Sequence, residues 1–95
     1  MPYVYILECS DGSYYTGSTV CDPDARVWEH NNDEDRAARY TIKRRPVTLV
    51  YTERYDSIES AFRRERQLHG WSRRKKQALI DGRIDDLIEL SRPRT

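Results

Sequence analysis

The feature that most constrains this fold is a tight turn near the N-terminus, Asp11-Gly12, between two short segments rich in tyrosine. Asp-Gly is a strong hairpin signal because glycine readily adopts the positive φ angle that a tight turn requires. The flanking segments, residues 3–9 and 13–19, are rich in residues that favour strands. We therefore expect the chain to begin with two antiparallel strands that pair with each other.

The middle of the chain predicts a helix and a third strand. Pro23 suits the first position of a helix behind an Asp22 N-cap, and this helix is expected to reach about Asn31. Residues 46–53 predict a strand in which alternate positions, Leu49 and Tyr51 among them, share one face. The basic stretch of residues 36–45 between them has no clear period.

The last part of the chain predicts three helices separated by breaks. A capping box at Asp56 predicts a helix to about Leu68, which a left-handed Gly70 ends. Two shorter helices follow, residues 72–80 and 84–90. The order of elements predicts an α+β fold, a small antiparallel three-stranded sheet flanked by helices. We expect one domain, with residues 1–82 as its body and residues 83–95 as a short C-terminal helix and tail.

The composition excludes a membrane protein. Charged residues make up 35% of the 95 residues, and the longest apolar run, residues 3–7, is far shorter than the roughly 20 residues of a spanning helix. This run follows no basic segment, so it is not a signal peptide, and we expect a cytoplasmic protein without a membrane partner. Cys9 and Cys21 form no CxxC pair, which favours two free thiols over a structural zinc site.

The net charge of +1 hides a strong asymmetry along the chain. Residues 36–76 contain 13 Lys and Arg against 4 Asp and Glu, whereas the remaining residues contain 4 basic and 12 acidic side chains. A local basic surface of this kind is typical of phosphate binding. The alternative is a solvated surface on which charges of both signs mix in the folded protein, and charge alone does not separate the two.

Two helices carry side chains that suggest chemistry. In the predicted helix after Asp56, Glu65 shares one face with four apolar residues, and an inward carboxylate is costly unless it is paired or holds a metal. The alternative, a structural ion pair with a buried arginine, is favoured slightly by this helix alone. In the first helix, Arg26 and His30 are four residues apart and point the same way. They suit phosphate binding and proton transfer, or are two surface residues beside Trp28.

Several short motifs together resemble the GIY-YIG nuclease superfamily. Residues 3–5 and 15–17 resemble its two-part tyrosine signature, and Arg26 followed by His30 resembles its first helix. The similarity to the small, single-domain bacterial branch continues through four further stretches and covers about residues 2–80: Ala38 to Thr41, Arg44 to Tyr51, Arg64-Glu65, and Gly70 to Arg73. Tyr3 stands where many members have glycine and Thr16 where they have isoleucine, and neither change removes a proposed catalytic group.

The resemblance implies a role for each matching residue. Tyr5 and Tyr15 would line the active site, one of them near the attacking water. Arg26 would hold the scissile phosphate, and His30 would assist by hydrogen bonding or proton transfer. Glu65 would bind a single divalent cation, Mg²⁺ or Mn²⁺, which agrees with its unusual position among apolar residues.

The joint role of the two tyrosines requires them to lie on the same face of the hairpin. A two-residue turn at Asp11-Gly12 would pair residues whose numbers sum to 23, which places Tyr5 and Tyr15 on opposite faces. We therefore predict a three-residue loop or a bulge that shifts the sum to 24.

The expected function is a metal-dependent endonuclease that hydrolyses phosphodiester bonds in DNA, with RNA left open as a substrate. Low sequence specificity is expected, with selection of unusual DNA structures in repair or recombination. One alternative is a catalytically weak or inactive nucleic-acid-binding module of the same fold, and a third is a protein-interaction module that uses the acidic flanks. The oligomeric state, monomer or weak dimer, stays open. The residues predicted to contact nucleic acid are Tyr40, Lys43, Arg44, Arg45, Arg64, Arg73, Arg74, Lys75 and Lys76.

Overall fold

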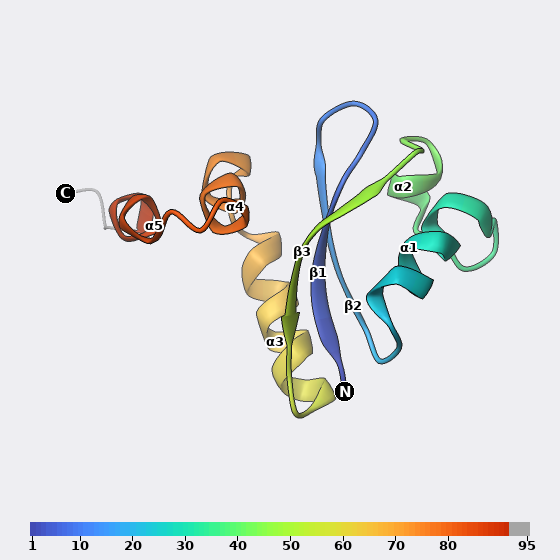
Figure 1. Ribbon diagram of the computed structural model, residues 1–95, viewed down its shortest axis with the longest axis horizontal. Helices are drawn as coiled ribbons and strands as arrows, with labels where there is room; N and C mark the ends of the chain where they lie inside the picture. The colour runs from blue at the N-terminus through green and yellow to red at the C-terminus, as the bar shows by residue number, and fades with distance from the viewer. Residues whose placement is uncertain (92–95) are drawn as a thin grey trace.

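The structure, a computed structural model, describes residues 1–91 and is built on a three-stranded antiparallel sheet (Figure 1). The strand order is β2-β1-β3, so the first strand pairs on both sides. The expected α+β fold with a three-stranded antiparallel sheet is confirmed. The strands are β1 (Tyr3–Glu8), β2 (Tyr14–Thr19) and β3 (Thr48–Arg54).

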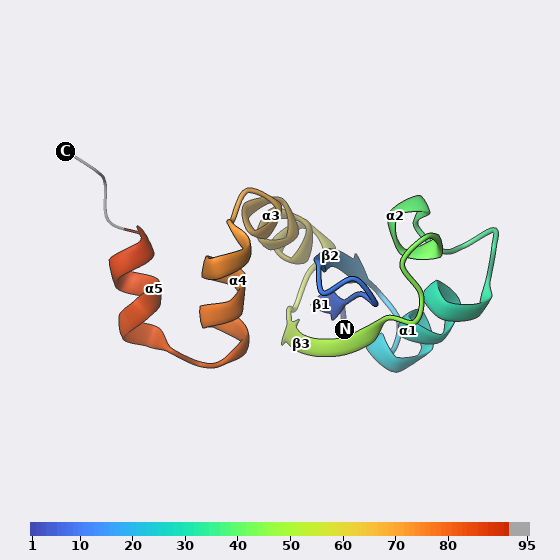
Figure 2. The same cartoon turned by 90° about the horizontal axis from the view of Figure 1, so that it is seen from above.

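Helices lie on both sides of the sheet, and the last helix extends away from it next to α4 (Figure 2). None of the helices in residues 1–91 is long and apolar enough to cross a membrane. Residues 92–95 of the expected tail lie outside the described residues. The helices are α1 (Pro23–Asn32) and α2 (Arg39–Ile42) on one side, α3 (Ile58–His69) and α4 (Arg73–Ile80) on the other, and α5 (Ile84–Ser91).

The hairpin between β1 and β2 closes through a three-residue loop. The backbone N–H of Cys9 donates to the carbonyl of Ser13 at 2.8 Å, and the N–H of Gly12 donates to the carbonyl of Cys9 at 2.9 Å. Gly12 has a φ of 82°, a left-handed conformation that glycine adopts without strain. The loop therefore consists of residues 10–12, with glycine in its last position.

This loop sets the register that brings two tyrosines to one face of the sheet. Tyr5 lies opposite Gly17, and Leu7 lies opposite Tyr15, so Tyr5 and Tyr15 point the same way, as the joint role of these residues requires. The predicted sum of 24 is wrong, because paired residue numbers sum to 22. The third loop residue is Ser10, before the Asp-Gly pair, rather than a residue after it.

A bulge in β3 places two side chains that are two residues apart on opposite faces of the sheet. Ile6 lies opposite Tyr51 and Leu7 opposite Leu49, which leaves Val50 as an extra residue in β3. Because Ile6 and Leu7 point to opposite faces, their partners do too. The predicted alternation that placed Leu49 and Tyr51 on one face is therefore wrong.

The sheet separates two small hydrophobic cores. On the side of α1, Tyr5 and Leu7 of β1 pack with Cys9 and Val47. On the side of α3 and α4, Val4 packs with the helix residues Ala61 and Leu68. Residues 4–7 of β1 are each almost completely buried, so this strand is covered on both faces.

The helix boundaries follow local signals with small shifts. The side chain of Asp22 accepts a hydrogen bond from the backbone of Asp24 at 2.9 Å, as expected for the N-cap of α1. The cap of α3 is Ser57 rather than Asp56. Gly70 ends α3 as predicted, but its φ is −79°, so the expected left-handed conformation is wrong.

The predicted apolar face of α3 is only partly buried. Ala61 and Leu68 face the sheet, whereas Ile58 and Phe62 are 64% and 51% exposed. Glu65 has a half-buried position at the border between these groups, with its side chain 19% exposed. The sequence argument therefore located Glu65 near the sheet but overestimated how apolar its surroundings are.

Candidate active site

The ring of Tyr5 lies across Gly17, its partner on the neighbouring strand. A Cβ atom at position 17 would meet the Cζ atom of Tyr5 at 2.6 Å, which no real structure tolerates without movement. Glycine is therefore needed here because the tyrosine ring occupies the space of a side chain. The ring is in turn held at a fixed position over the edge strand β2.

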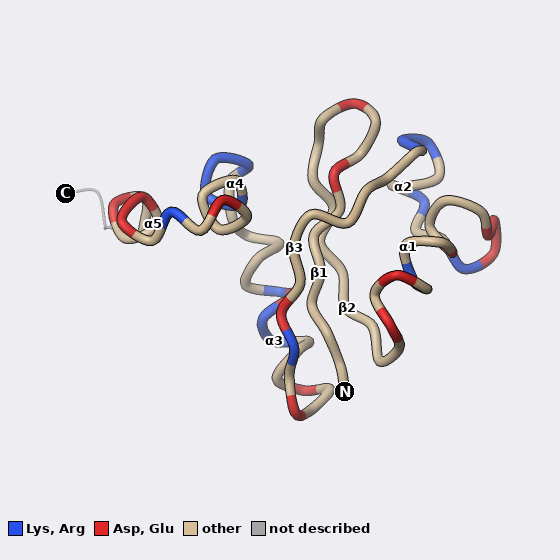
Figure 3. Tube along the Cα trace, viewed as in Figure 1, with Lys and Arg blue, Asp and Glu red and all other residues tan. Residues whose placement is uncertain are grey.

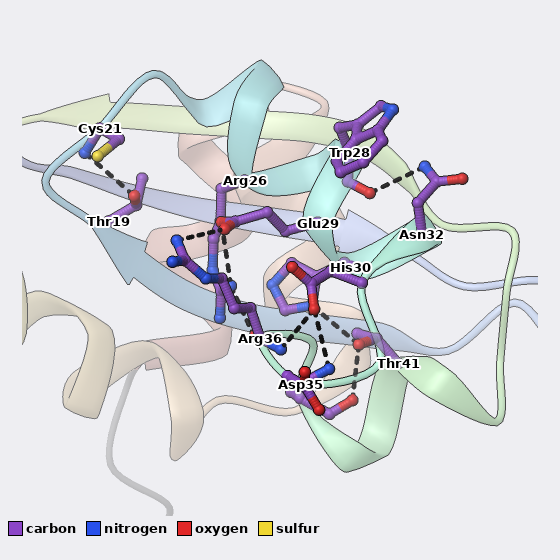
Figure 4. Close-up of polar contacts among 12 residues, drawn as sticks. Thr19, Cys21, Arg26, Trp28, Glu29, His30, Asn32, Asp35, Arg36 and Thr41 are labelled. Carbon is purple, nitrogen blue, oxygen red and sulfur yellow. Dashed lines mark hydrogen bonds and ion pairs between the residues drawn. The ribbon is translucent and has the colours of Figure 1, made fainter.

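A buried chain of hydrogen bonds fixes the hydroxyl of Tyr5. The hydroxyl of Thr41 donates to the carbonyl of Ala38 at 2.8 Å, so its oxygen accepts from Nδ1 of His30, also at 2.8 Å (Figure 4). Nε2 of His30 is then the unprotonated nitrogen, and it lies 2.8 Å from the hydroxyl of Tyr5. The hydroxyl of Tyr5 therefore donates a hydrogen bond to His30, and the contact with Thr41 determines which tautomer of the imidazole is present.

Burial controls the ionisation of this pair. His30 is completely buried, and desolvation, with the nearby positive charge of Arg26, lowers its pKa to about 4. Desolvation raises the pKa of Tyr5 to about 12, although the same arginine opposes the shift. At neutral pH the imidazole is therefore neutral and able to accept a proton, and the phenol is protonated.

Tyr15 is in contact with the same imidazole but is held differently. Its ring meets that of His30 edge-on, with centroids 5.4 Å apart, and stacks on Tyr40 at 5.8 Å. The guanidinium of Arg44 also lies over the ring of Tyr40, 3.8 Å from the ring centroid. Within residues 1–91, the hydroxyl of Tyr15 has no hydrogen-bond partner, so it is available to a ligand.

Arg26 projects from α1 toward the tyrosines and is partly neutralised. Its Nη1 atom donates to the carbonyl of Arg36 at 2.7 Å and lies 3.3 Å from a carboxylate oxygen of Glu29 (Figure 4). Its charge also acts on Tyr5 and Tyr15, lowering the pKa of each against the effect of burial. The guanidinium also lies within hydrogen-bonding range of the Tyr5 hydroxyl, so an anion that binds it would lie beside this hydroxyl.

Glu65 approaches the same region from the other side of the sheet. Oε1 accepts a hydrogen bond from the hydroxyl of Ser18 on the edge strand at 2.5 Å, and Oε2 lies 3.3 Å from Nε2 of His69. The carboxylate charge of Glu65 contributes to the raised pKa values of Tyr5 and Tyr15.

The donor set around Glu65 fits one loosely held divalent cation. Each carboxylate oxygen has one neighbour in the protein and keeps a lone pair for another. Across the described part of the chain, no group of three or more His, Cys, Asp or Glu residues gathers as a metal site. A single carboxylate suits a hard cation that takes its other ligands from water and phosphate oxygens.

The comparison with protein-family models gives the family. Residues 1–78, which include every residue of this candidate site, match the model of the GIY-YIG catalytic domain. The chain belongs to the GIY-YIG family. This family consists of endonucleases, which act on nucleic acids and generally use divalent metal ions, so the chain has a nuclease-type domain.

Individual proteins similar to this GIY-YIG domain carry names without a specific function. A UPF0213 protein of Halobacterium salinarum is 51% identical over 84% of this chain and all of its own length. A UPF0213 protein of Staphylococcus aureus is 47% identical over 85% of this chain and 95% of its own. The solution NMR structure of a UPF0213 protein from Bacillus halodurans matches with a TM-score of 0.53 and 46% identity, over 85% of this chain and 84% of that one.

Three of the basic residues predicted to contact nucleic acid are paired or buried within this GIY-YIG domain. Arg45 donates to the carbonyls of His30 and Asp33 and pairs with Glu34. Arg64 pairs through two nitrogens with the carboxylate of Glu53. Lys76 is only 9% exposed, and burial lowers its pKa. These contacts could not be read from the sequence, because charge along a chain does not reveal which cations are buried or paired. The residues concerned are Arg45, Arg64 and Lys76.

The other predicted contact residues lie at or near the surface in two groups, on α2 and α4, on opposite sides of the sheet (Figure 3). The α2 group contacts Tyr15 because the ring of Tyr40 stacks on the ring of Tyr15. The same group lines a pocket of about 340 Å³. In the α4 group, Arg73 donates to the carbonyl of Gly12 in the hairpin loop at 2.7 Å. The first group is Tyr40, Lys43 and Arg44, and the second is Arg73, Arg74 and Lys75.

The sequence interpretation missed two residues that orient the candidate groups. Thr41 sets the tautomer of His30, and Ser18 orients Glu65. Thr41 lies in the basic stretch to which no element was assigned, and Ser18 directly follows the residues of the second tyrosine motif. Thr41 falls within a stretch that resembles the family, but the resemblance gave it no role. The role of each residue depends on a side chain that the fold brings from another element.

Proposed function

We propose that the protein is a divalent-metal-dependent endonuclease that hydrolyses phosphodiester bonds in DNA, with Tyr5, Tyr15, Arg26, His30 and Glu65 as its active site. The observation that carries this proposal is the buried hydrogen bond from Tyr5 to His30, in range of the charges of Arg26 and Glu65. A proton acceptor, an anion-binding group and a metal-binding carboxylate are the parts that phosphodiester hydrolysis requires.

The tyrosine and histidine would remove the proton of the attacking water together. As the oxygen of Tyr5 takes a proton from water, its own proton passes along the 2.8 Å hydrogen bond to Nε2 of His30. The low pKa of His30 makes it a weak base in the free protein, but a bound phosphodiester brings a negative charge that raises this pKa. The bond from Nδ1 to Thr41 keeps the accepting nitrogen free of a proton.

The phosphate would be held from two sides. Arg26 would bind non-bridging oxygens of the scissile phosphate through the guanidinium nitrogens that the protein does not use. Glu65 would hold one Mg²⁺ or Mn²⁺, which supplies charge stabilisation to the phosphate and to the leaving oxygen. The free hydroxyl of Tyr15 would donate a hydrogen bond to a phosphate oxygen or to the water.

Low sequence specificity follows from the surface near the site. The exposed contact groups on α2 and α4 are mainly cations, which bind phosphates of any base sequence. Both helices are short, four and eight residues, and α4 is tied to the hairpin loop through Arg73. We therefore expect recognition of backbone and DNA structure, as in repair or recombination intermediates, rather than of a base sequence.

A cleavage assay tests this proposal. Plasmid, single-stranded DNA, branched DNA and RNA are incubated with Mg²⁺ or Mn²⁺ and the wild-type protein, Glu65→Ala or the control Glu59→Gln, which changes an exposed carboxylate on the same helix. We expect metal-dependent cutting by the wild type and the control, and a loss of about 100-fold or more in Glu65→Ala.

Three results contradict the proposal. Cutting that survives in Glu65→Ala places the activity elsewhere or in a contaminant. Absence of cutting in the wild type, with binding that weakens steeply as salt rises, indicates a nucleic-acid-binding module of the same fold. Absence of any salt-dependent DNA binding indicates a protein-interaction module instead.

A further inference from the structure

The last turn of α3 places a second metal-binding side chain beside Glu65. His69 is four residues after it, so both side chains lie on the same side of the helix. Nε2 of His69 lies 3.3 Å from Oε2 of Glu65. Two ligands that bind one ion at right angles, at about 2.1 Å each, are about 3.0 Å apart, so this pair is close to chelating geometry.

The second oxygen of Glu65 is oriented by the edge strand. Ser18 donates to Oε1 at 2.5 Å, and this bond leaves Oε2 facing the imidazole. The side chain of Glu65 is 19% exposed and that of His69 is 49% exposed, so the carboxylate is sheltered while the imidazole remains open to solvent. An ion can therefore reach both atoms without displacing a packed side chain.

The kind of ligand determines which metal the pair favours. Imidazole nitrogen suits first-row transition metals, whereas Mg²⁺ prefers oxygen ligands and keeps its water. We propose that His69 and Glu65 together form a two-ligand site that selects Mn²⁺ over Mg²⁺. This inference rests on the proposed role of Glu65 as the metal ligand and adds a residue that determines metal preference.

A simple ion pair on the helix is the competing explanation of the same contact. A glutamate and a histidine four residues apart can pair on the surface of a helix, and the C-terminal turn of a helix favours a positively charged side chain. Such a pair predicts no metal preference. The two explanations therefore differ in metal binding by the protein without nucleic acid.

Mn²⁺ and Mg²⁺ affinities, measured by calorimetry on the protein alone, separate these explanations. His69→Gln keeps a hydrogen-bonding side chain but removes the imidazole, Glu65→Gln removes the carboxylate, and Glu59→Gln is the matched control on the same helix. We expect Mn²⁺ to bind more tightly than Mg²⁺ to the wild type and the control. In His69→Gln the Mn²⁺ affinity falls about tenfold or more while the Mg²⁺ affinity stays within about twofold.

Pulsed electron paramagnetic resonance of bound Mn²⁺ gives a second readout, independent of cleavage. The chain has two histidines, and both ring nitrogens of the other, His30, are in buried hydrogen bonds. A nitrogen coupling in the wild type that disappears in His69→Gln therefore assigns the ligand.

Equal Mn²⁺ affinity in the wild type and His69→Gln overturns this inference and leaves the proposed function intact. Metal binding that is unchanged in Glu65→Gln overturns the proposed metal site itself, and with it the inference.

Discussion

The close contact between Tyr5 and Gly17 means that only glycine fits at position 17 while the tyrosine ring keeps its place. We expect Gly17→Ala to destabilise the protein by about 1–3 kcal/mol, because the added Cβ drives the tyrosine ring away from its position and from His30. The free energy of unfolding, measured by urea denaturation, gives the effect, and cleavage should fall with it.

The cause of this effect is tested in a second background. In Tyr5→Leu the ring atoms that the new methyl group would meet are absent, so Gly17→Ala should cost less there than in the wild type. Equal costs in the two backgrounds would assign the effect to the backbone of β2 rather than to the tyrosine ring.

The buried imidazole of His30 predicts a pH dependence of stability. Its pKa is about 4 in the folded protein and near 6.5 in the unfolded chain, so the unfolded chain takes up the proton first as the pH falls. Stability should therefore decrease from about pH 6.5 down to about pH 4, by on the order of 3 kcal/mol in total, and change little through this group above that range.

Urea denaturation at a series of pH values measures this dependence. His30→Gln is the matched variant, because glutamine does not titrate. The difference in unfolding free energy between the two proteins should shrink as the pH falls through this range. Parallel curves for the two proteins would show that His30 is not the group responsible.

At the residue scale, the sequence indicated which side chains belong together better than it indicated which side chains are buried or paired. Tyr5 and Tyr15 share a face because a loop of three residues joins their strands, and the need for such a loop could be argued from the Asp-Gly position. The fates of Arg45 and Arg64 could not be predicted, because the carbonyls and carboxylates that bind them come from other parts of the chain. Identical residue types therefore serve the fold at one position and the surface at another.

The end of α1 and the beginning of β3 are joined by one arginine side chain. Arg45 donates to the carbonyls of His30 and Asp33 and pairs with Glu34. We expect Arg45→Ala to destabilise the protein by about 1–3 kcal/mol, because two partly buried carbonyls lose their partner. Lys43→Ala, two residues away and exposed, should change stability by less than about 0.5 kcal/mol.

Nucleic-acid binding should show the reverse order for the same two variants. Lys43→Ala should weaken DNA binding and reduce the slope of log affinity against log salt concentration by about one, whereas Arg45→Ala should mainly lower stability. Thermal denaturation and DNA-binding titrations at several salt concentrations measure the two effects. A purely salt-dependent effect of Arg45→Ala, with stability unchanged, would contradict this division.

At the scale of elements, caps and turns carried most of the predictable information. Asp22 and Ser72 begin helices as expected, because a side chain that satisfies free backbone N–H groups is a local property. The four-residue helix α2 was missed, since one turn is too short to show a period. The bulge at Val50 was missed as well, because it depends on how β3 pairs with β1.

At the scale of the whole molecule, the last helix is an addition to the family domain. The GIY-YIG match ends at residue 78, and α5 makes its main contact with α4. We expect a chain that ends at Arg83 to lose less than about 1 kcal/mol of unfolding free energy and to keep its cleavage activity. Calorimetric melting and the plasmid assay measure both, and a large loss of either would show that α5 supports the candidate active site.

The strand β1 is paired on both edges and covered on both faces, so its local unfolding should cost more free energy than that of other elements. Its amide hydrogens should be among the slowest to exchange with solvent, and Tyr5 is anchored on it. Glu65 and Arg26 are instead carried by helices that each cover one side of the sheet. Heating should therefore inactivate the protein by detaching a helix before the sheet itself comes apart, so that loss of function precedes the main melting transition.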